Sequence, residues 1–342
     1  MKKLMTLALA AGMLLGAATG ASAIDFKAKG QWLMGFSAGD GSLVSHTKTN
    51  KASNHNKAAD TDDIFSASQR LRLQLDAVAS EALSGTVFFE IGDTNWGKNS
   101  NGGALGADQE IVEVKNAYID WMVPNTDLKF RMGIQGIQLP NVAGGSAILD
   151  DDVAAITASY QFNENVALTA MWARPYNDNY NDNYTGTDRV NYHDNMDLFA
   201  LMVPLTFDGV KVTPWAMYGM AGANTNGLTS TAPYARYINN KGYAFDDTTT
   251  GKAYGSMFWA GLPISLTLWD PLNVELDINY GYVESMGRYQ AERYGSAADF
   301  RMGDTKREGW LVKALVEYKM DWGTPGIFGW YASGDDGNVK NG

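Results

Sequence analysis

The stretch that decides the fold is FSASQRLRLQLDAVA, from Phe65 to Ala79. Read at every second position, it separates into an apolar and a polar series. The apolar series, which Gln69 interrupts, is Phe65, Ala67, Leu71, Leu73, Leu75, Ala77 and Ala79. The polar series is Ser66, Ser68, Arg70, Arg72, Gln74 and Asp76. A period of two predicts a β-strand with one apolar and one polar face, and its length suits a tilted strand that crosses a bilayer.

Two folds can use such a strand. In a soluble β-sandwich, Leu71, Leu73 and Leu75 would point into a packed core. In a transmembrane β-barrel the leucines would face lipid, and Arg70 and Arg72 would face a water-filled lumen. An arginine facing lipid near the membrane midplane would cost about 2–4 kcal/mol, so a barrel must place the polar series inside.

The N-terminus predicts a secretory signal over residues 1–23. Lys2 and Lys3 form its charged region, Leu4 to Ala18 its apolar region, and Ala21 to Ala23 a small-residue cleavage site. An N-terminal membrane anchor is the alternative, but the apolar run is short for a spanning helix. We therefore expect an exported mature chain, and no later run is apolar and long enough for a spanning helix.

Composition excludes several functions. The chain has a formal net charge of −11, which argues against nucleic acid as a partner because phosphate binding needs concentrated lysine and arginine. It contains no cysteine, so neither disulfides nor a thiolate metal site is available. We expect no metal and no cofactor. The 37 glycines and the many aromatic residues suit a barrel, although a secreted all-β protein would also use them.

The alternating pattern recurs along the chain and predicts thirteen strands. They cover residues 24–36, 65–79, 86–96, 110–123, 128–135, 153–162, 166–173, 196–207, 210–220, 256–269, 272–283, 307–320 and 327–333. Short turns and long polar loops alternate between them, as in outer-membrane barrels. The fold class is therefore all-β, a transmembrane antiparallel β-barrel with 13 strands readable here.

The later strands separate in the same way as the first. Residues 272–283 and 307–320 each place charged side chains on one face and apolar ones on the other. Charges on the inner series of several strands imply a wet lumen, because a packed core would bury them at high cost. Aromatic residues near strand ends predict interfacial girdles. They are Phe36, Trp96, Trp121, Trp172, Trp259, Trp269, Tyr318 and Trp322.

Two segments carry a family resemblance, FEIGDTNWG (Phe89 to Gly97) and NAYIDWMVPNTDLKFRMGIQ (Asn116 to Gln135). They resemble the homotrimeric outer-membrane porins of sulfate-reducing bacteria. The resemblance implies a trimer of 16-stranded barrels among the lipids and lipopolysaccharide of a Gram-negative outer membrane. It implies passive diffusion of ions and small hydrophilic solutes, and no enzymatic activity. Since residues 24–342 provide thirteen strands and end in polar GDDGNVKNG, we expect a C-terminal truncation that lacks about three strands.

In porins of this kind, the third long loop folds into the lumen and narrows it. Strand counting places that loop at residues 136–152, where it carries the acidic run Asp150, Asp151 and Asp152. By the resemblance, these carboxylates would face a basic wall across the constriction. The candidates for that wall are Arg70, Arg72, Lys129 and Arg131. The alternative is that the acidic run caps a strand at the solvent edge.

Specific residues also leave other functions open. An outer-membrane enzyme could use His193 and Asp194 as an acid–base pair, but that pair and the other histidines, His46 and His55, fall in predicted loops. The run YNDNYNDNY, from Tyr176 to Tyr184, offers oxygen ligands but lacks the glycine and glutamate of a calcium loop. A surface adhesin or receptor barrel would need no open lumen.

Overall fold

The computed structural model describes residues 24–40, 63–98, 102–106, 111–177, 195–222, 254–284, 288–292, 300–304 and 307–334. The predicted signal segment, residues 1–23, lies outside them. The chain divides into two compact units, Met1–Ala117 and Tyr118–Gly342. No helix among the described residues is both long and apolar enough to cross a membrane.

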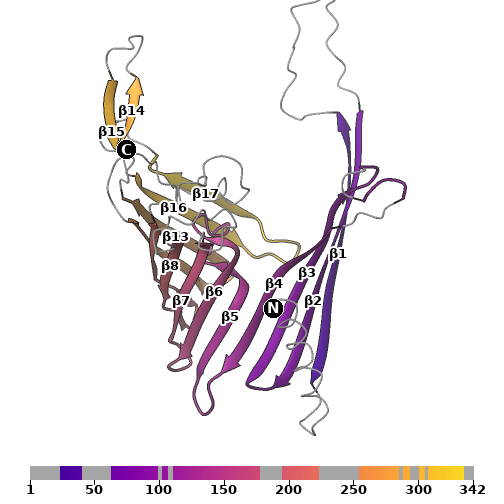
Figure 1. Ribbon diagram of the computed structural model, residues 1–342. Helices are drawn as coiled ribbons and strands as arrows, with labels where there is room; N and C mark the ends of the chain where they lie inside the picture. The colour runs from indigo at the N-terminus through magenta and orange to yellow at the C-terminus, as the bar shows by residue number, and fades with distance from the viewer. Residues whose placement is uncertain are drawn as a thin grey trace, which may run out of the picture. The chain divides into compact units, whose positions relative to one another are not determined.

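The first unit is an antiparallel sheet (Figure 1). Its strands are β1 (Asp25–Asp40), β2 (Asp63–Ser80), β3 (Leu83–Asn95) and the first part of β4 (Val112–Met122). Leu71 lies opposite Trp32 of β1 and Ile91 of β3, while Arg72 lies opposite Glu90. The register therefore confirms the predicted division of β2 into an apolar and a polar face.

Gln69, the one polar residue in the apolar series, has a local explanation. Its side-chain oxygen accepts a hydrogen bond from the indole N–H of Trp96, at 3.2 Å. The pairing of β2 with β3 shifts between Gln69 and Arg70, where Gly92 and Asp93 adopt positive φ. The amide thus satisfies an indole donor at an irregularity of the ladder, which leaves the alternation intact on either side.

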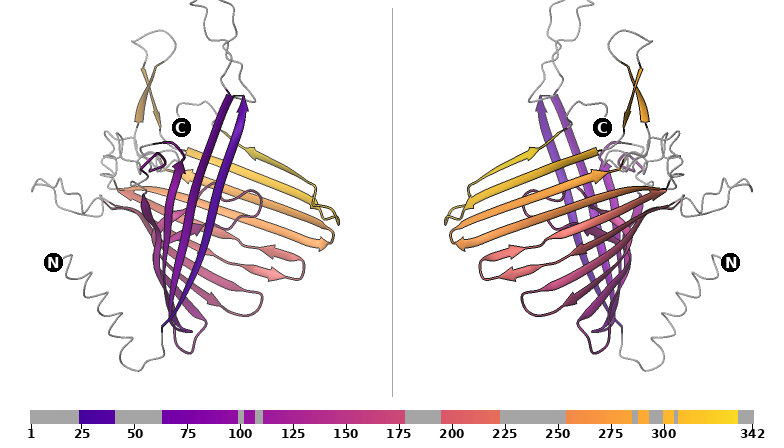
Figure 2. Two further views of the ribbon diagram at one scale, coloured as in Figure 1. Left: turned by 90° about the vertical axis from the view of Figure 1, so that its right-hand side faces the viewer. Right: turned by 90° about the vertical axis from the view of Figure 1, so that its left-hand side faces the viewer.

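The second unit is likewise an antiparallel sheet, which begins with the remainder of β4 (Figures 1 and 2). Its main strands in sheet order are β5 (Leu128–Gln138), β6 (Asp150–Gln161), β7 (Ala167–Asn177), β8 (Asn195–Met202), β11 (Trp215–Gly222), β12 (Tyr254–Trp269), β13 (Leu272–Val283), β16 (Arg307–Tyr318) and β17 (Gly326–Ala332). The short strands β9 (Leu205–Phe207) and β10 (Val210–Val212) form the hairpin between β8 and β11, and β10 also pairs with β12. The all-β antiparallel fold class is confirmed.

Thirteen strands follow one another along the hydrogen-bonded path of the described residues, as the alternation predicts. The additional short strands arise because the strands predicted at 196–207 and 210–220 are interrupted before Pro204 and Pro214. Proline has no N–H to donate to the ladder, although its carbonyl still accepts, as Pro204 does from Ala167 at 3.1 Å. The prediction also missed a hairpin, β14 (Arg288–Glu292) with β15 (Phe300–Asp304), within the loop expected at residues 284–306.

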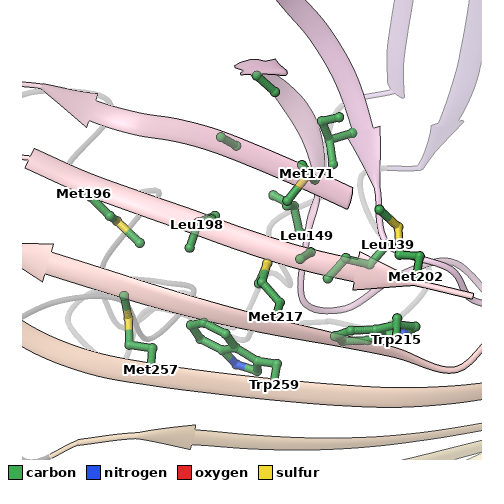
Figure 3. Close-up of a cluster of buried hydrophobic side chains, with 14 of the residues drawn as sticks. Leu139, Leu149, Met171, Met196, Leu198, Met202, Trp215, Met217, Met257 and Trp259 are labelled. Atoms are coloured by element: carbon green, nitrogen blue, oxygen red, sulfur yellow. The ribbon is translucent and has the colours of Figure 1, made fainter. Parts of the chain in front are cut away.

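One face of the second unit's sheet bears an apolar cluster, which Figure 3 shows with Leu139 and Leu149 of the β5–β6 connection lying among its side chains. We call this the loop-bearing face and its opposite the exposed face. The buried sheet residues of the cluster include Met171, Ala173, Met196, Leu198, Trp215, Met217, Met257 and Trp259. Trp259 was predicted in an interfacial girdle. That prediction is wrong, because its position in the alternation of β12 turns its ring toward the loop.

Candidate functional site

The candidate site is built around loop 139–149, which connects β5 to β6 on the loop-bearing face. Leu139 and Ala143 are fully buried, and Leu149 is 5% exposed. The N–H of Leu139 donates to the carbonyl of Leu149 at 3.0 Å, which closes the loop at its base. Apolar packing and a backbone hydrogen bond thus fix both ends of the loop, and the segment between them projects over the sheet.

Trp215 of β11 holds one side of this loop. Its indole N–H donates to the carbonyl of Pro140 at 2.9 Å, and its ring is 4% exposed. The ring lies over Gly261 of the neighbouring strand β12, where an added Cβ would come within 2.3 Å of it. Only a glycine leaves room for the indole in this orientation, so Gly261 positions Trp215.

The tip of the loop reaches other strands. The ammonium of Lys313 in β16 donates to the carbonyl of Gly145 at 2.5 Å. A Cβ on Gly144 would lie 3.4 Å from the ring of Phe328 in β17. Gly144 and Gly145 have φ values of 78° and 85°, which glycine adopts without strain. Because one short loop contacts β11, β16 and β17, the sheet of the second unit must curve around it.

The acidic run does not belong to the loop, and the predicted bounds 136–152 are corrected to 139–149. Asp150, Asp151 and Asp152 lie in β6, opposite Gln138, Ile137 and Gly136 of β5. The pairing extends this far because the residues of β5 continue the alternation beyond Gln135. We note that this is the placement of the alternative interpretation, in which the run ends a strand.

Alternation divides the acidic run between the two faces of β6. Asp151 shares the loop-bearing face with the buried Ala155, whereas Asp150 and Asp152 share the exposed face with Ile156. Asp150 accepts a hydrogen bond from the Gln138 amide at 2.7 Å. By this alternation Asp151 faces the loop side, and the Asp150 carboxylate also comes near the loop, because a Cβ on Gly145 would lie 4.0 Å from its Oδ2.

Arg131 and Lys129 lie on the loop-bearing face and share one carboxylate, which the sequence analysis missed. Arg131 donates two hydrogen bonds to Asp120 of β4, both at 2.8 Å, and Lys129 lies 3.3 Å from the same carboxylate. The guanidinium carbon of Arg131 also lies 4.1 Å from the ring centre of Tyr118. The wall here carries a cluster of mixed sign with one excess positive charge.

Arg70 and Arg72 belong to the first unit, and each also has an acidic neighbour on β3. Arg72 donates to Glu90 at 2.6 Å, and Arg70 lies 3.4 Å from Asp93. These two arginines and the acidic run belong to different units. The transverse field predicted between them remains a prediction.

Sequence reasoning missed the acidic partners because they depend on register rather than on any local motif. Glu90 was placed on a strand and Asp120 fell within a resembling segment, but single-strand alternation does not show which residues lie opposite. Asp277 and Lys313 were both assigned to polar series, and only the pairing of β13 with β16 places them opposite each other.

The exposed face of the second unit is apolar along β16, with aromatic residues toward its ends. Trp310 is 53% exposed and Tyr318 is 46% exposed, and the exposed Ala314 lies midway between them. The ring of Trp310 packs on Tyr280 of β13 at 4.8 Å between centroids. In the first unit, Phe36 and Trp96, two of the predicted girdle residues, pack edge to face at 5.7 Å.

One charged group interrupts the exposed face of β7 and β8. Arg174 donates two hydrogen bonds to Asp197, at 2.9 and 3.0 Å, and the Trp172 indole N–H donates to the same carboxylate at 2.7 Å. The pair lies near the ends of its strands and is neutralised by bidentate contact. Paired charges beside a half-buried tryptophan are compatible with a membrane–water boundary.

The metal and acid–base candidates lie mostly outside the described residues. Within the described part of the chain, no group of three or more His, Asp or Glu side chains could hold a metal ion. His46, His55 and His193 lie outside the described residues, as do residues 178–184 of the tyrosine-rich run.

Comparison with known proteins found no matching family model and no matching curated protein. Solved structures do show similarity. The outer-membrane channel DcaP of Acinetobacter baumannii matches with a TM-score of 0.44 and 12% identity, over 92% of this chain and 80% of that one. OmpF of Salmonella typhi, solved with daunomycin, matches with 0.41 and 12%, over 90% and 78%. A loop-deletion form of OmpT, an outer-membrane protein of Vibrio cholerae, matches with 0.38 and 14%, over 92% and 95%.

Proposed function

We propose that the protein is an outer-membrane porin, a water-filled channel for passive diffusion of ions and small hydrophilic solutes that loop 139–149 narrows. One observation carries the proposal. In the second unit the ion pairs Arg131–Asp120 and Lys313–Asp277 lie on the face that bears the loop, while the opposite face of β16 exposes Trp310 and Tyr318.

The energetics favour lipid on the exposed face and water on the other. A soluble protein rarely exposes a continuous apolar face of this size, whereas a lipid-facing sheet must. Tyr331 and Ile327 of β17 lie opposite Val312 and Val316 of β16 and are each more than half exposed, which extends the apolar surface to the last described strand. The partly exposed charges of the loop-bearing face, Arg131 and Asp120, would be solvated by the lumen.

The ion pairs suggest how such a lumen would treat solutes. Arg131 with Asp120 and Arg72 with Glu90 are partly exposed, so their fields reach water without strong net charge. A passage lined by paired charges orients water and polar solutes but discriminates weakly by sign. We therefore favour a general diffusion channel over one selective for a single solute.

Assembly and location complete the proposal. A porin with this arrangement would function as a homotrimer in the outer membrane of a Gram-negative bacterium, in contact with lipid and lipopolysaccharide. The exposed apolar faces described above supply surface both for lipid and for contact between subunits. Cross-linking of the protein in vesicles would report the assembly, and a strictly monomeric product would contradict it.

Liposome swelling tests the channel. Vesicles that contain the purified protein should swell in small sugars at rates that fall with sugar size, and vesicles without protein should not. Equal swelling rates for all sugars would refute a size-limited pore, and so would the absence of any swelling. An adhesin or receptor barrel with a closed lumen would give the second result.

Charge selectivity tests the position of the acidic run. Asp151→Asn should shift the reversal potential under a salt gradient toward anion preference, because Asp151 lies on the loop-bearing face. Asp152→Asn is the matched control on the opposite face of the same strand, and should leave the reversal potential unchanged. Equal shifts from both would contradict the division of the run between faces.

A further inference from the structure

The strongest unexplained feature is a charged pair buried beneath the tip of loop 139–149. Asp277 of β13 is 1% exposed and Lys313 of β16 is 6% exposed. The two residues lie directly opposite each other in the ladder, and the ammonium is 2.7 Å from the carboxylate. Side chains on a water-filled lumen need not be dehydrated in this way, so the pair calls for a role.

The two charges of the pair offset the cost of each other's burial. Within the described residues, the carboxylate oxygens of Asp277 have no hydrogen-bond partner, so the ammonium of Lys313 is what offsets their burial there. Removing one partner of a buried ion pair strands a charge, which is far more costly than removing both. The state of Lys313 therefore determines whether Asp277 can remain dehydrated.

Lys313 also contacts the loop. Its ammonium donates to the carbonyl of Gly145, and the positive φ of Gly145 belongs to the turn that presents this carbonyl. Loop and ion pair thus share one ammonium. The docked tip shields the pair from water, and the pair in turn supplies the donor that holds the tip.

The two ends of the loop are held differently from its tip. Leu139 and Leu149 are anchored by apolar packing, and the Pro140 carbonyl by the Trp215 indole. The tip is held by Lys313 and by contact near Phe328. Movement that preserves the apolar base would occur between residues 140 and 148, where Gly144 and Gly145 provide backbone freedom.

We propose that Lys313 and Asp277 form a latch that keeps the tip of loop 139–149 docked, and that undocking both widens the passage and exposes the two charges to it. The inference rests on the proposed channel for its functional consequence. The latch itself is a property of the loop, which can be measured without any conduction. Lys313 acts as the positioning residue for the loop, and Asp277 holds Lys313 in place.

Thiol accessibility provides the test, because the chain contains no cysteine. A cysteine replacing the buried Ala143 should react slowly with N-ethylmaleimide when the tip is docked. The exposed Ala147, replaced by cysteine in the same loop, is the control and should react quickly in every background. A neutral reagent is chosen so that altered charges in the variants do not change its local concentration.

The latch predicts a non-additive pattern. In protein reconstituted in vesicles, Lys313→Met should raise the reaction rate at position 143 at least tenfold, because the stranded Asp277 carboxylate must be hydrated. Asp277→Asn should raise it as well. The double variant Lys313→Met/Asp277→Asn strands no charge but still lacks the donor to Gly145, so it should react faster than the parent, by no more than about threefold, and more slowly than Lys313→Met.

If Lys313→Met, Asp277→Asn and the double variant all gave the same reaction rate at position 143, the latch would be overturned. A double variant that reacts as fast as Lys313→Met would overturn it as well. If Ala143→Cys does not fold, Ser146→Cys is a nearly isosteric probe of the same tip and should follow the same order of variants. Conductance is recorded on the same preparations. If the order of thiol rates is as predicted but no channels are recorded, the proposed function is refuted and the latch stands. If channels are recorded but the thiol rates do not follow that order, only the latch is refuted.

Discussion

Ala314→Arg tests on which face of the sheet the lipid lies. Ala314 is exposed on β16, pairs with Leu276 of β13 and Gly329 of β17, and lies four residues from both Trp310 and Tyr318. In water, arginine at an exposed strand position would change stability by no more than about 0.5 kcal/mol. In lipid the same change would bury a charge.

The geometry sets the expected magnitude. At about 3.4 Å per residue and a tilt of about 40°, each aromatic residue lies roughly 10 Å from Ala314 along the membrane normal. Two girdles so placed fit an apolar band about 25 Å tall, with Ala314 near its middle. Arginine at that depth should cost about 2–4 kcal/mol, which lowers the folding equilibrium constant by about 30- to 900-fold.

The assay is urea-dependent folding into lipid vesicles, followed by tryptophan fluorescence. Met320→Arg is the matched control, because Met320 lies beyond Tyr318 at the turn, where the cost should fall to about 0–1 kcal/mol. A penalty below about 0.5 kcal/mol for Ala314→Arg, or equal penalties at both positions, would refute a lipid-facing surface here.

Three further predictions address the loop-bearing face. Asp120→Asn should shift the reversal potential toward anion preference, because it leaves two basic side chains without their shared carboxylate. Arg131→Gln should shift the reversal potential toward cation preference. Shifts of the same sign from both variants would contradict a charge cluster that faces the lumen. Leu139→Ala should lower the free energy of unfolding in urea by about 2–5 kcal/mol, since the side chain is fully buried, and a negligible loss would contradict the packed loop base. Gly261→Ala should lower the free energy of unfolding by about 1–3 kcal/mol, because the added methyl group collides with the Trp215 indole. Gly323→Ala, where an added Cβ meets nothing within 4 Å, should leave it nearly unchanged. Equal stability of the two variants would argue against the packing of Trp215 on Gly261.

Alternation within single strands was enough to predict most of the fold. The assignment of Leu71 and Arg72 to opposite faces needed only the period of two and the cost of charge in lipid. The same reasoning failed before Pro204 and Pro214, where a missing donor interrupts a strand without disturbing its apolar pattern. It also failed at Trp259. Where the loop-bearing face is apolar beneath the loop, its residues alternate along the strand just as those of the apolar exposed face do.

The candidate site was less predictable, because it depends on contacts between strands and with the loop. Asp151 could be separated from its neighbours only after the end of the β5–β6 pairing was known. Asp120 required the position of Arg131 across the sheet. The burial of Asp277 required the fold of a loop that lies far earlier in the chain. Lys313 and Gly145, which join the latch to that loop, are separated by 168 residues in the sequence. No pattern in one strand carries that information.

Single-channel recording tests the central claim, that the protein encloses a water-filled passage. Protein refolded in detergent, with its β-sheet content verified by circular dichroism, is added to a planar lipid bilayer in potassium chloride. The account predicts discrete conductance steps whose size rises in proportion to the bulk conductivity of the salt. Folded, inserted protein that gives no steps, or steps that do not follow bulk conductivity, would contradict a wet diffusion pore.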